Sequence, residues 1–206
     1  MIDLSHLAEF LLSVIAISVV PGPDTIYVLS RSLSQGRRGG LAACLGSAVG
    51  VMGHVTLGVI GLSALIMASP PAFLFVKVCG TCYLVYLGIR LLGQSDIPIG
   101  GHKLRKDTLR IVWFQGILTN LLNPKVAMFF LAFIPQFIDL HRGHVPLQFL
   151  ALGVVFDCIG TSWLCIVAIS SSALSIWVHT HPIALTWQQR LTGVVFIVFA
   201  VRLALP

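Results

Sequence analysis

Two ionisable residues of opposite sign, Asp24 and Lys125, each follow a proline inside an apolar stretch of the chain. Asp24 ends the sequence Val-Pro-Gly-Pro-Asp (20–24), and Lys125 ends Asn-Pro-Lys (123–125). Charges in apolar segments are costly and usually serve a function. If the two lie close together, they could bind the amino and carboxylate groups of a zwitterionic solute, or bind each other when the site is empty. A purely structural ion pair is the alternative.

The prolines beside these charges must interrupt any helix that contains them. A proline has no backbone N–H, and its ring clashes with the preceding turn. Inside lipid, the carbonyl groups freed by such a break need partners that lipid cannot supply, so the break must face protein or a water-filled cavity. We therefore expect one helix break at Pro21, Gly22 and Pro23, and a second at Pro124. The helix N-termini beyond them would add partial positive charge for a carboxylate.

Four further polar residues in apolar stretches are candidates for the same site. Asn120 and Asn123 precede the second break, where their amides could satisfy freed carbonyls or contact a solute. Carboxyl groups removed from water can carry a proton near neutral pH, so Asp24 and Asp157 are candidates for proton coupling. His54 interrupts a row of small residues that favours close helix packing, and could relay a proton. For Asp157 and His54, a hydrogen-bonded packing role is the alternative.

The composition places the chain in a membrane. Of 206 residues, 57% are hydrophobic and 10% are charged, whereas soluble domains are about one quarter charged. Long apolar runs favour helices over an outer-membrane barrel, whose strands would alternate in polarity. The net charge of +6 comes from residues clustered in loops, which indicates a lipid bilayer rather than nucleic acid as partner. The N-terminus lacks the positive region of a cleavable signal peptide.

Six apolar segments are each near or above the roughly 20 residues that cross a bilayer. The first and the fourth contain the proline breaks. We expect an all-α integral membrane protein with one transmembrane domain over 1–206. The segments cover about 7–33, 41–67, 72–92, 111–134, 146–177 and 187–205.

The basic residues are distributed unevenly between the two predicted faces. Nine lie at the loops of one face, and two lie at the other. By the positive-inside rule the first face is cytoplasmic, which places both termini outside. The nine are Arg31, Arg37, Arg38, Arg90, Lys103, Arg105, Lys106, Arg110 and Arg190, and the two are Arg142 and Arg202.

The chain divides into two halves that resemble each other. The first covers about 1–93 and the second about 111–206, joined by a polar loop of about 94–110. Shifting the sequence by 101 positions places Pro23 on Pro124 and Asp24 on Lys125. With three segments per half, the second half enters the membrane from the opposite side. Such inverted repeats are typical of secondary transporters, whose sites lie at paired broken helices.

With these residues placed, the chain resembles the LysE/RhtB family of bacterial amino-acid exporters. Four stretches carry the resemblance in the family's order and spacing, and it covers essentially the whole chain. It implies export of amino acids or related metabolites across the bacterial inner membrane by proton antiport, with no cofactor beyond the proton motive force. The substrate stays open, because family members handle basic, neutral and sulfur-containing amino acids. The four stretches are 20–24, 31–41, 83–90 and 114–125.

Two other functions are weighed against export. Six-helix proteins of the wider superfamily look like thiol-redox carriers with a cysteine at each proline break, where this chain has Asp24 and Lys125. For a non-transporting membrane adaptor, these buried charges would be an unexplained cost. Enzyme motifs and a metal-binding histidine set are not found. The small-residue faces permit a homo-oligomer without requiring one.

Overall fold

The structure is a computed structural model, and all regular structure in its described part is helical. By length and apolar composition, two helical stretches qualify as able to cross a membrane, Val145–Ile169 and Pro23–Gly61, the second of which is interrupted at Gly36. Leu109–Leu121 and Pro124–Phe137, which meet at 45°, can form a third, bent span. The described residues are 4–62, 69–93, 107–171, 187, 190–191, 193–198 and 200–201.

The first helix break lies at the proline pair. Helix α1 (Leu4–Val19) ends before it, and α2 (Pro23–Leu57) begins at its second proline. Residues 20–22 between them are not helical. Pro23 suits the first position of a helix, because an N–H there would have no partner within the helix. Gly22 precedes it as the N-cap and has no side chain to bond to the first turn.

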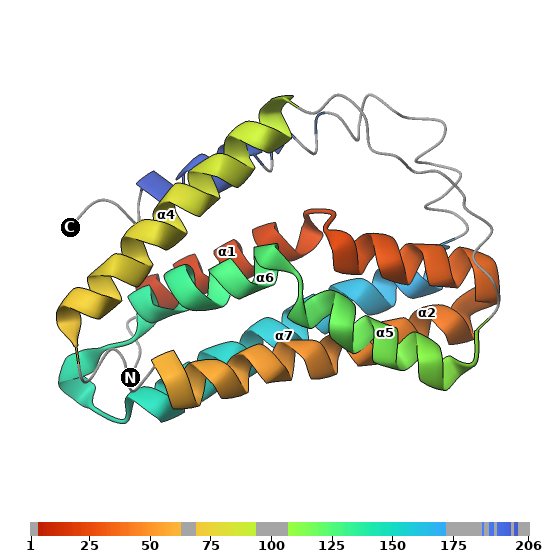
Figure 1. Cartoon of the computed structure of the whole chain (residues 1–206), viewed down its shortest axis with the longest axis horizontal. Helices are drawn as coiled ribbons and strands as arrows, with labels where there is room; N and C mark the ends of the chain where they lie inside the picture. The colour runs from red at the N-terminus through yellow and green to blue at the C-terminus, as the bar shows by residue number, and fades with distance from the viewer. Residues whose placement is uncertain are drawn as a thin grey trace.

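Helix α2 reverses its direction at Gly36 (Figure 1). Gly36 has φ 73° and ψ −175°, a backbone conformation that favours glycine. Beyond the turn, Gly40 lies against the side chain of Ser32, although residues eight apart in a straight helix are separated by about 12 Å. The segments predicted from the sequence, about 7–33 and 41–67, leave a short connection between them. The structure continues both helices into that connection and reverses the chain within a single non-helical residue.

The remaining elements follow the predicted segments with shifted ends. The predicted span of 146–177 gives a helix that ends at Ile169, and the residues from 172 to 186 lie outside the described part. So does most of the predicted loop of about 94–110. The described residues between 187 and 201 are helical. The elements are a π-turn η1 (Gly58–Leu62), α4 (Pro70–Gly93), α5 (Leu109–Leu121), α6 (Pro124–Met128), a π-helix η2 (Phe129–Phe133), the 3-10 turns η3 (Ile134–Phe137) and η4 (Leu140–Arg142), and α7 (Val145–Ile169).

The second helix break lies between α5 and α6. Pro124 takes the first position of α6, as Pro23 does in α2. Here the N-cap is Asn123, and its side-chain oxygen accepts a hydrogen bond of 3.0 Å from the backbone N–H of Lys125. The second break therefore has a side-chain cap, a common way to satisfy the free N–H groups of a helix start.

The second arm of α2 packs closely on α5 through its row of small residues. Glycine has no Cβ atom; if Gly50 carried one, it would lie only 2.7 Å from the Cβ of Asn120, which is too close for two carbon atoms that are not bonded. Gly46 lies against the backbone of Trp113 and Gly116 in the same way. The small residues thus allow the close helix contact that their spacing predicts. On the other side of α2 lies α7, so α2 forms the centre of the bundle.

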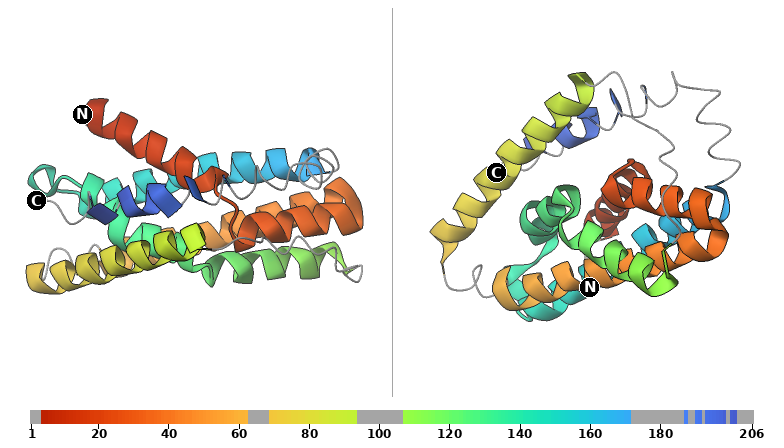
Figure 2. Two further views of the ribbon diagram at one scale, coloured as in Figure 1. Left: turned by 90° about the horizontal axis from the view of Figure 1, so that it is seen from above. Right: turned by 45° about the vertical axis from the view of Figure 1, so that its right-hand side comes forward.

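The described elements form a bundle with two ends. Helix α1 begins at one end, where the described C-terminal residues also finish, and the Gly36 turn lies at the other end (Figures 1 and 2). Helix α4 and the helical residues 193–198 lie side by side at the edge of the bundle. They approach closely, because a Cβ atom added to Gly193 would lie only 2.6 Å from the carbonyl oxygen of Gly88.

Candidate functional site

The two helix breaks meet in the interior of the bundle. Lys125 Nζ lies 3.9 Å from Asp24 Oδ1, and Asn123 Nδ2 donates to the same oxygen at 3.2 Å. Asp24 is 8% exposed, Lys125 9% and Asn123 1%. The structure therefore brings together three of the residues that the sequence predicts for a solute site. Removal from water strengthens the attraction between such charges.

Lys125 also completes the hydrogen bonding of α1. Its Nζ donates to the backbone carbonyls of Ile17, at 3.2 Å, and Val20, at 3.0 Å. In a continuous helix the carbonyl of Ile17 would accept from the N–H of residue 21, but Pro21 has no N–H. An ammonium group has three donors. Two serve these carbonyls, and Asp24 lies beyond hydrogen-bond distance of Nζ.

A histidine serves the second break in a related way. The carbonyl of Asn120 loses its helical donor because Pro124 lacks an N–H. The backbone N–H of Asn123 donates to this carbonyl at 2.9 Å, and His54 Nε2 lies 3.3 Å from it. Since a carbonyl only accepts, the contact requires a proton on Nε2. His54 also stacks on Phe130, with ring centroids 5.7 Å apart.

A cavity of about 20 Å³ adjoins the two breaks. Asp24, Asn120 and Lys125 form part of its lining, together with residues of α1, α2 and α7. This volume is close to the room that a single water molecule needs. An amino acid could enter only if the surrounding helices separated.

Several buried polar atoms around this cavity have no hydrogen-bond partner among the described residues. They are the Oγ atoms of Ser18 and Ser47, Asn120 Oδ1 and Trp163 Nε1. Buried polar groups are normally paired, so these atoms favour water or a polar solute in the cavity. Asn120 is predicted from the sequence. Nothing in the sequence separates Ser47 or Trp163 from residues that only pack.

Asp157 lies beside the cavity but is not part of its lining. It accepts a hydrogen bond of 3.0 Å from Thr161 Oγ1, one turn further along α7, and Thr161 does line the cavity. Asp157 thus reaches the cavity through Thr161. His54 likewise reaches it through Asn120. The three acid–base candidates from the sequence therefore do not form one directly bonded group.

A second buried polar cluster lies near the Gly36 turn, at Arg31. The sequence assigns Arg31 to a loop, but it lies inside α2 and is only 4% exposed. Its Nη2 lies 2.8 Å from Asp107 Oδ2 and 2.6 Å from Gln115 Oε1. The hydroxyl of Tyr27 donates to the same Gln115 oxygen at 3.1 Å. These contacts join the first arm of α2 to α5, and counting loop charges could not reveal them.

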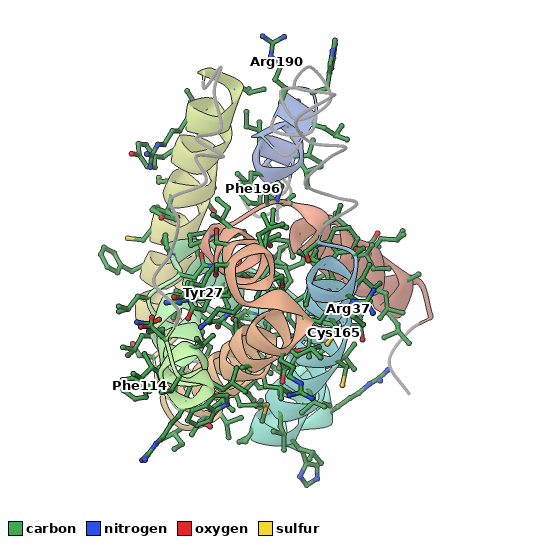
Figure 3. All side chains as sticks on the ribbon, turned by 90° about the vertical axis from the view of Figure 1, so that its right-hand side faces the viewer. Tyr27, Arg37, Phe114, Cys165, Arg190 and Phe196 are labelled. Atoms are coloured by element: carbon green, nitrogen blue, oxygen red, sulfur yellow. The ribbon has the colours of Figure 1, made fainter. Side chains whose placement is uncertain are left out.

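Figure 3 shows the bundle from the Gly36 end. Tyr27 lies between α2 and α5, where its single hydroxyl proton has a second acceptor within reach, the carbonyl of Val112 at 2.9 Å. Phe114, on the same helix as Val112, points outward and is 55% exposed. The polar side chains thus face the helix interfaces, while large apolar side chains cover the outside, as expected for a protein surrounded by lipid.

The cysteines do not form the arrangement that a redox carrier would need. Cys44 on α2 and Cys165 on α7 are free thiols whose sulfur atoms lie 3.4 Å apart. Cys79 and Cys82 are exposed free thiols on α4. The positions after the helix-starting prolines hold Asp24 and Lys125 instead. Among the described residues no group of three potential metal ligands occurs.

Comparison with known proteins identifies the family. The model of the LysE type translocator family matches residues 15–206. Proteins named leucine efflux protein from Salmonella typhimurium and Salmonella typhi are 30% identical over 200 residues, covering 95% of this chain and 92% of theirs. An uncharacterized membrane protein of Vibrio cholerae is 37% identical over 155 residues, or 74% of each chain. No solved structure matches. The chain therefore belongs to the LysE type translocator family.

Proposed function

We propose that this protein exports amino acids from the cytoplasm across the inner membrane in exchange for protons. The observation that carries the proposal is the meeting of two oppositely charged residues at two helix breaks, 3.9 Å apart beside a cavity. Family membership and the relatives named leucine efflux protein support an amino acid as the solute. A thiol-redox carrier and a membrane adaptor have no comparable support.

In the proposed site, Asp24 binds the amino group of the solute and Lys125 binds its carboxylate. Lys125 can do this while still holding α1, because two of its three donors serve backbone carbonyls. Asn123 already donates to Asp24, so it orients the carboxylate. Asn120 lines the cavity, and its Oδ1 has no partner among the described residues, so in the proposed site it accepts from the solute's amino group.

We propose alternating access about these breaks, within six spans arranged as two inverted repeats of about 1–93 and 111–206. In support, Pro23 and Pro124 both begin helices, and each is followed directly by a charged residue. In the predicted orientation, the Gly36 end faces the cytoplasm and both termini lie outside. We propose that the contacts of Arg31 with Asp107 hold that end closed and separate before a solute enters.

Protons enter the proposed cycle through carboxylate and imidazole groups near the breaks. A proton on Asp24 removes its attraction for the solute's amino group and so favours release outside. Asp157 and His54, linked to the cavity through Thr161 and Asn120, are the other proposed proton carriers. Asp157→Asn and His54→Gln should therefore weaken the dependence of export on the pH gradient more than they weaken exchange of solute without a gradient.

Reconstituted vesicles with an imposed pH gradient test the proposal. A panel of amino acids is loaded, and efflux is followed with and without an uncoupler. We expect solute efflux that the uncoupler stops, and at least a tenfold loss in Asp24→Asn and in Lys125→Ala. Asp139→Asn, which removes a partly exposed carboxylate that pairs with Arg142 and does not line the cavity, is the matched control. Wild-type efflux in both site variants would reject the central site, and efflux insensitive to the uncoupler would reject antiport.

A further inference from the structure

Gly160 on α7 differs from the other interior glycines of the described helices. A Cβ atom on Gly50 would lie 2.7 Å from a neighbouring helix, and one on Gly153 would lie 2.6 Å from Val55. A Cβ on Gly160 would meet only Ser18 Oγ, at 3.8 Å, an ordinary van der Waals distance. Helix packing therefore does not require a glycine at this position. Its effect is to leave space in the cavity that it lines.

The lining of this cavity combines polar and apolar side chains. Its polar members include the charges of Asp24 and Lys125 and the hydroxyl groups of Ser18 and Ser47. Several branched or aromatic apolar side chains also line it. Within the described lining, Asp24 and Lys125 are the only charged residues. The apolar side chains are Ile17, Val51, Val126, Phe156 and Leu164.

We propose that Gly160, with Val51, Phe156 and Leu164, forms the subsite for the solute's side chain and selects neutral amino acids by size. This inference rests on the proposed export function. With its amino and carboxylate groups held at the breaks, a solute would extend its side chain between α2 and α7, past Gly160. A charged side chain there would lose its hydration, and with Asp24 and Lys125 occupied by the solute's own charges the lining holds no further charged residue to pair with it, which is costly.

Replacing Gly160 tests the size limit. In vesicles, Gly160→Ala places a methyl group where a branched side chain would lie. One methylene of fit in an apolar pocket changes selectivity by about 10- to 200-fold. We therefore expect the kcat/KM ratio of leucine to alanine to fall at least tenfold in Gly160→Ala, and alanine export to fall as well in Gly160→Val. The wild-type protein should prefer both to lysine and glutamate.

Two further variants make the result decisive. Gly61→Ala adds the same methyl group in η1, where nothing lies within 4 Å, and should leave the ratio unchanged. Val51→Ala enlarges the subsite from α2 and should shift preference toward larger side chains, so it decides the question if Gly160→Ala does not fold. Amino-acid export with an unchanged ratio in the folded variants, or a preference for lysine or glutamate, overturns the subsite alone. A wild-type protein that exports no amino acid overturns the proposed function itself.

Discussion

The two helix breaks begin with the same proline geometry but are stabilised differently. At the first break the N-cap is Gly22, which has no side chain, and the freed carbonyl of Ile17 is served by Lys125. At the second break Asn123 caps α6 with its own side chain. The freed carbonyl of Asn120 there has two donors close by, the backbone of Asn123 and the ring of His54.

This difference shows which break depends on contacts from distant sequence. The first break takes its compensating contacts from residues about one hundred positions later in the chain. The second break carries most of its compensation locally, and His54 adds to it from α2. If the two breaks move against each other in a transport cycle, separating them would leave the first break with unpaired carbonyls. The second would keep its cap.

The largest effect is expected from Lys125→Ala. It removes the donor to two carbonyls of the first break and leaves the buried carboxylate of Asp24 without its cation. Removing one partner of a buried ion pair typically costs about 3–5 kcal/mol. Lys125→Arg keeps the charge and the donors, so it should retain most of the stability. Unfolding of the purified protein in mixed micelles measures the stability of both variants. Equal stability of the two would show that the first break does not depend on the charge and donors of residue 125.

A smaller effect is expected from Asn123→Ala, which acts mainly on the second break. Loss of an N-cap side chain costs about 0.5–2 kcal/mol, and the hydrogen bond to Asp24 is lost as well. Asn123→Ser should restore the cap without the amide donor, which separates the two contributions. The same unfolding measurement applies. If Asn123→Ala lowers the free energy of unfolding as much as Lys125→Ala does, the second break depends on contacts with distant residues as much as the first.

The smallest effect is expected from His54→Phe. The ring stays stacked on Phe130, while the contact with the Asn120 carbonyl is lost. The backbone N–H of Asn123 still serves that carbonyl. Hydrogen bonds between helices in a membrane average about 0.6 kcal/mol, so the melting temperature should change little. His54→Ala, which also removes the stacking, is the comparison variant. A large fall in the melting temperature of His54→Phe itself would show that the second break depends on α2.

Much of the central cluster could be predicted from the sequence, because its residues have strong local signals. Prolines in apolar stretches mark the breaks, and the shift of 101 positions pairs Asp24 with Lys125. The close packing of α2 on α5 follows from glycine spacing. What the sequence does not show is the backbone role of Lys125, since no pattern reveals which carbonyl a flexible ammonium group will reach.

Other parts of the site depend on tertiary contacts that leave no such signal. Arg31 lies seven residues from Arg38 and looks like another loop charge, but the turn closes at Gly36 and leaves Arg31 inside a helix. Ser47, Gly160 and Trp163 each occur in apolar sequence where small or aromatic residues usually pack. Only the meeting of α1, α2 and α7 makes them neighbours of one cavity.

The reversal at Gly36 has a consequence for how the chain enters the bilayer. Because one residue turns the chain, the two arms of α2 form a hairpin with almost no connecting loop to pass through the headgroups. We expect the arms to insert together, as a single helical hairpin, after both have left the ribosome. A residue with a side chain at Gly36 would have to adopt a backbone conformation that is essentially confined to glycine, at a cost of about 1–3 kcal/mol. Such a substitution should therefore lower the yield of inserted protein before it changes the rate of transport.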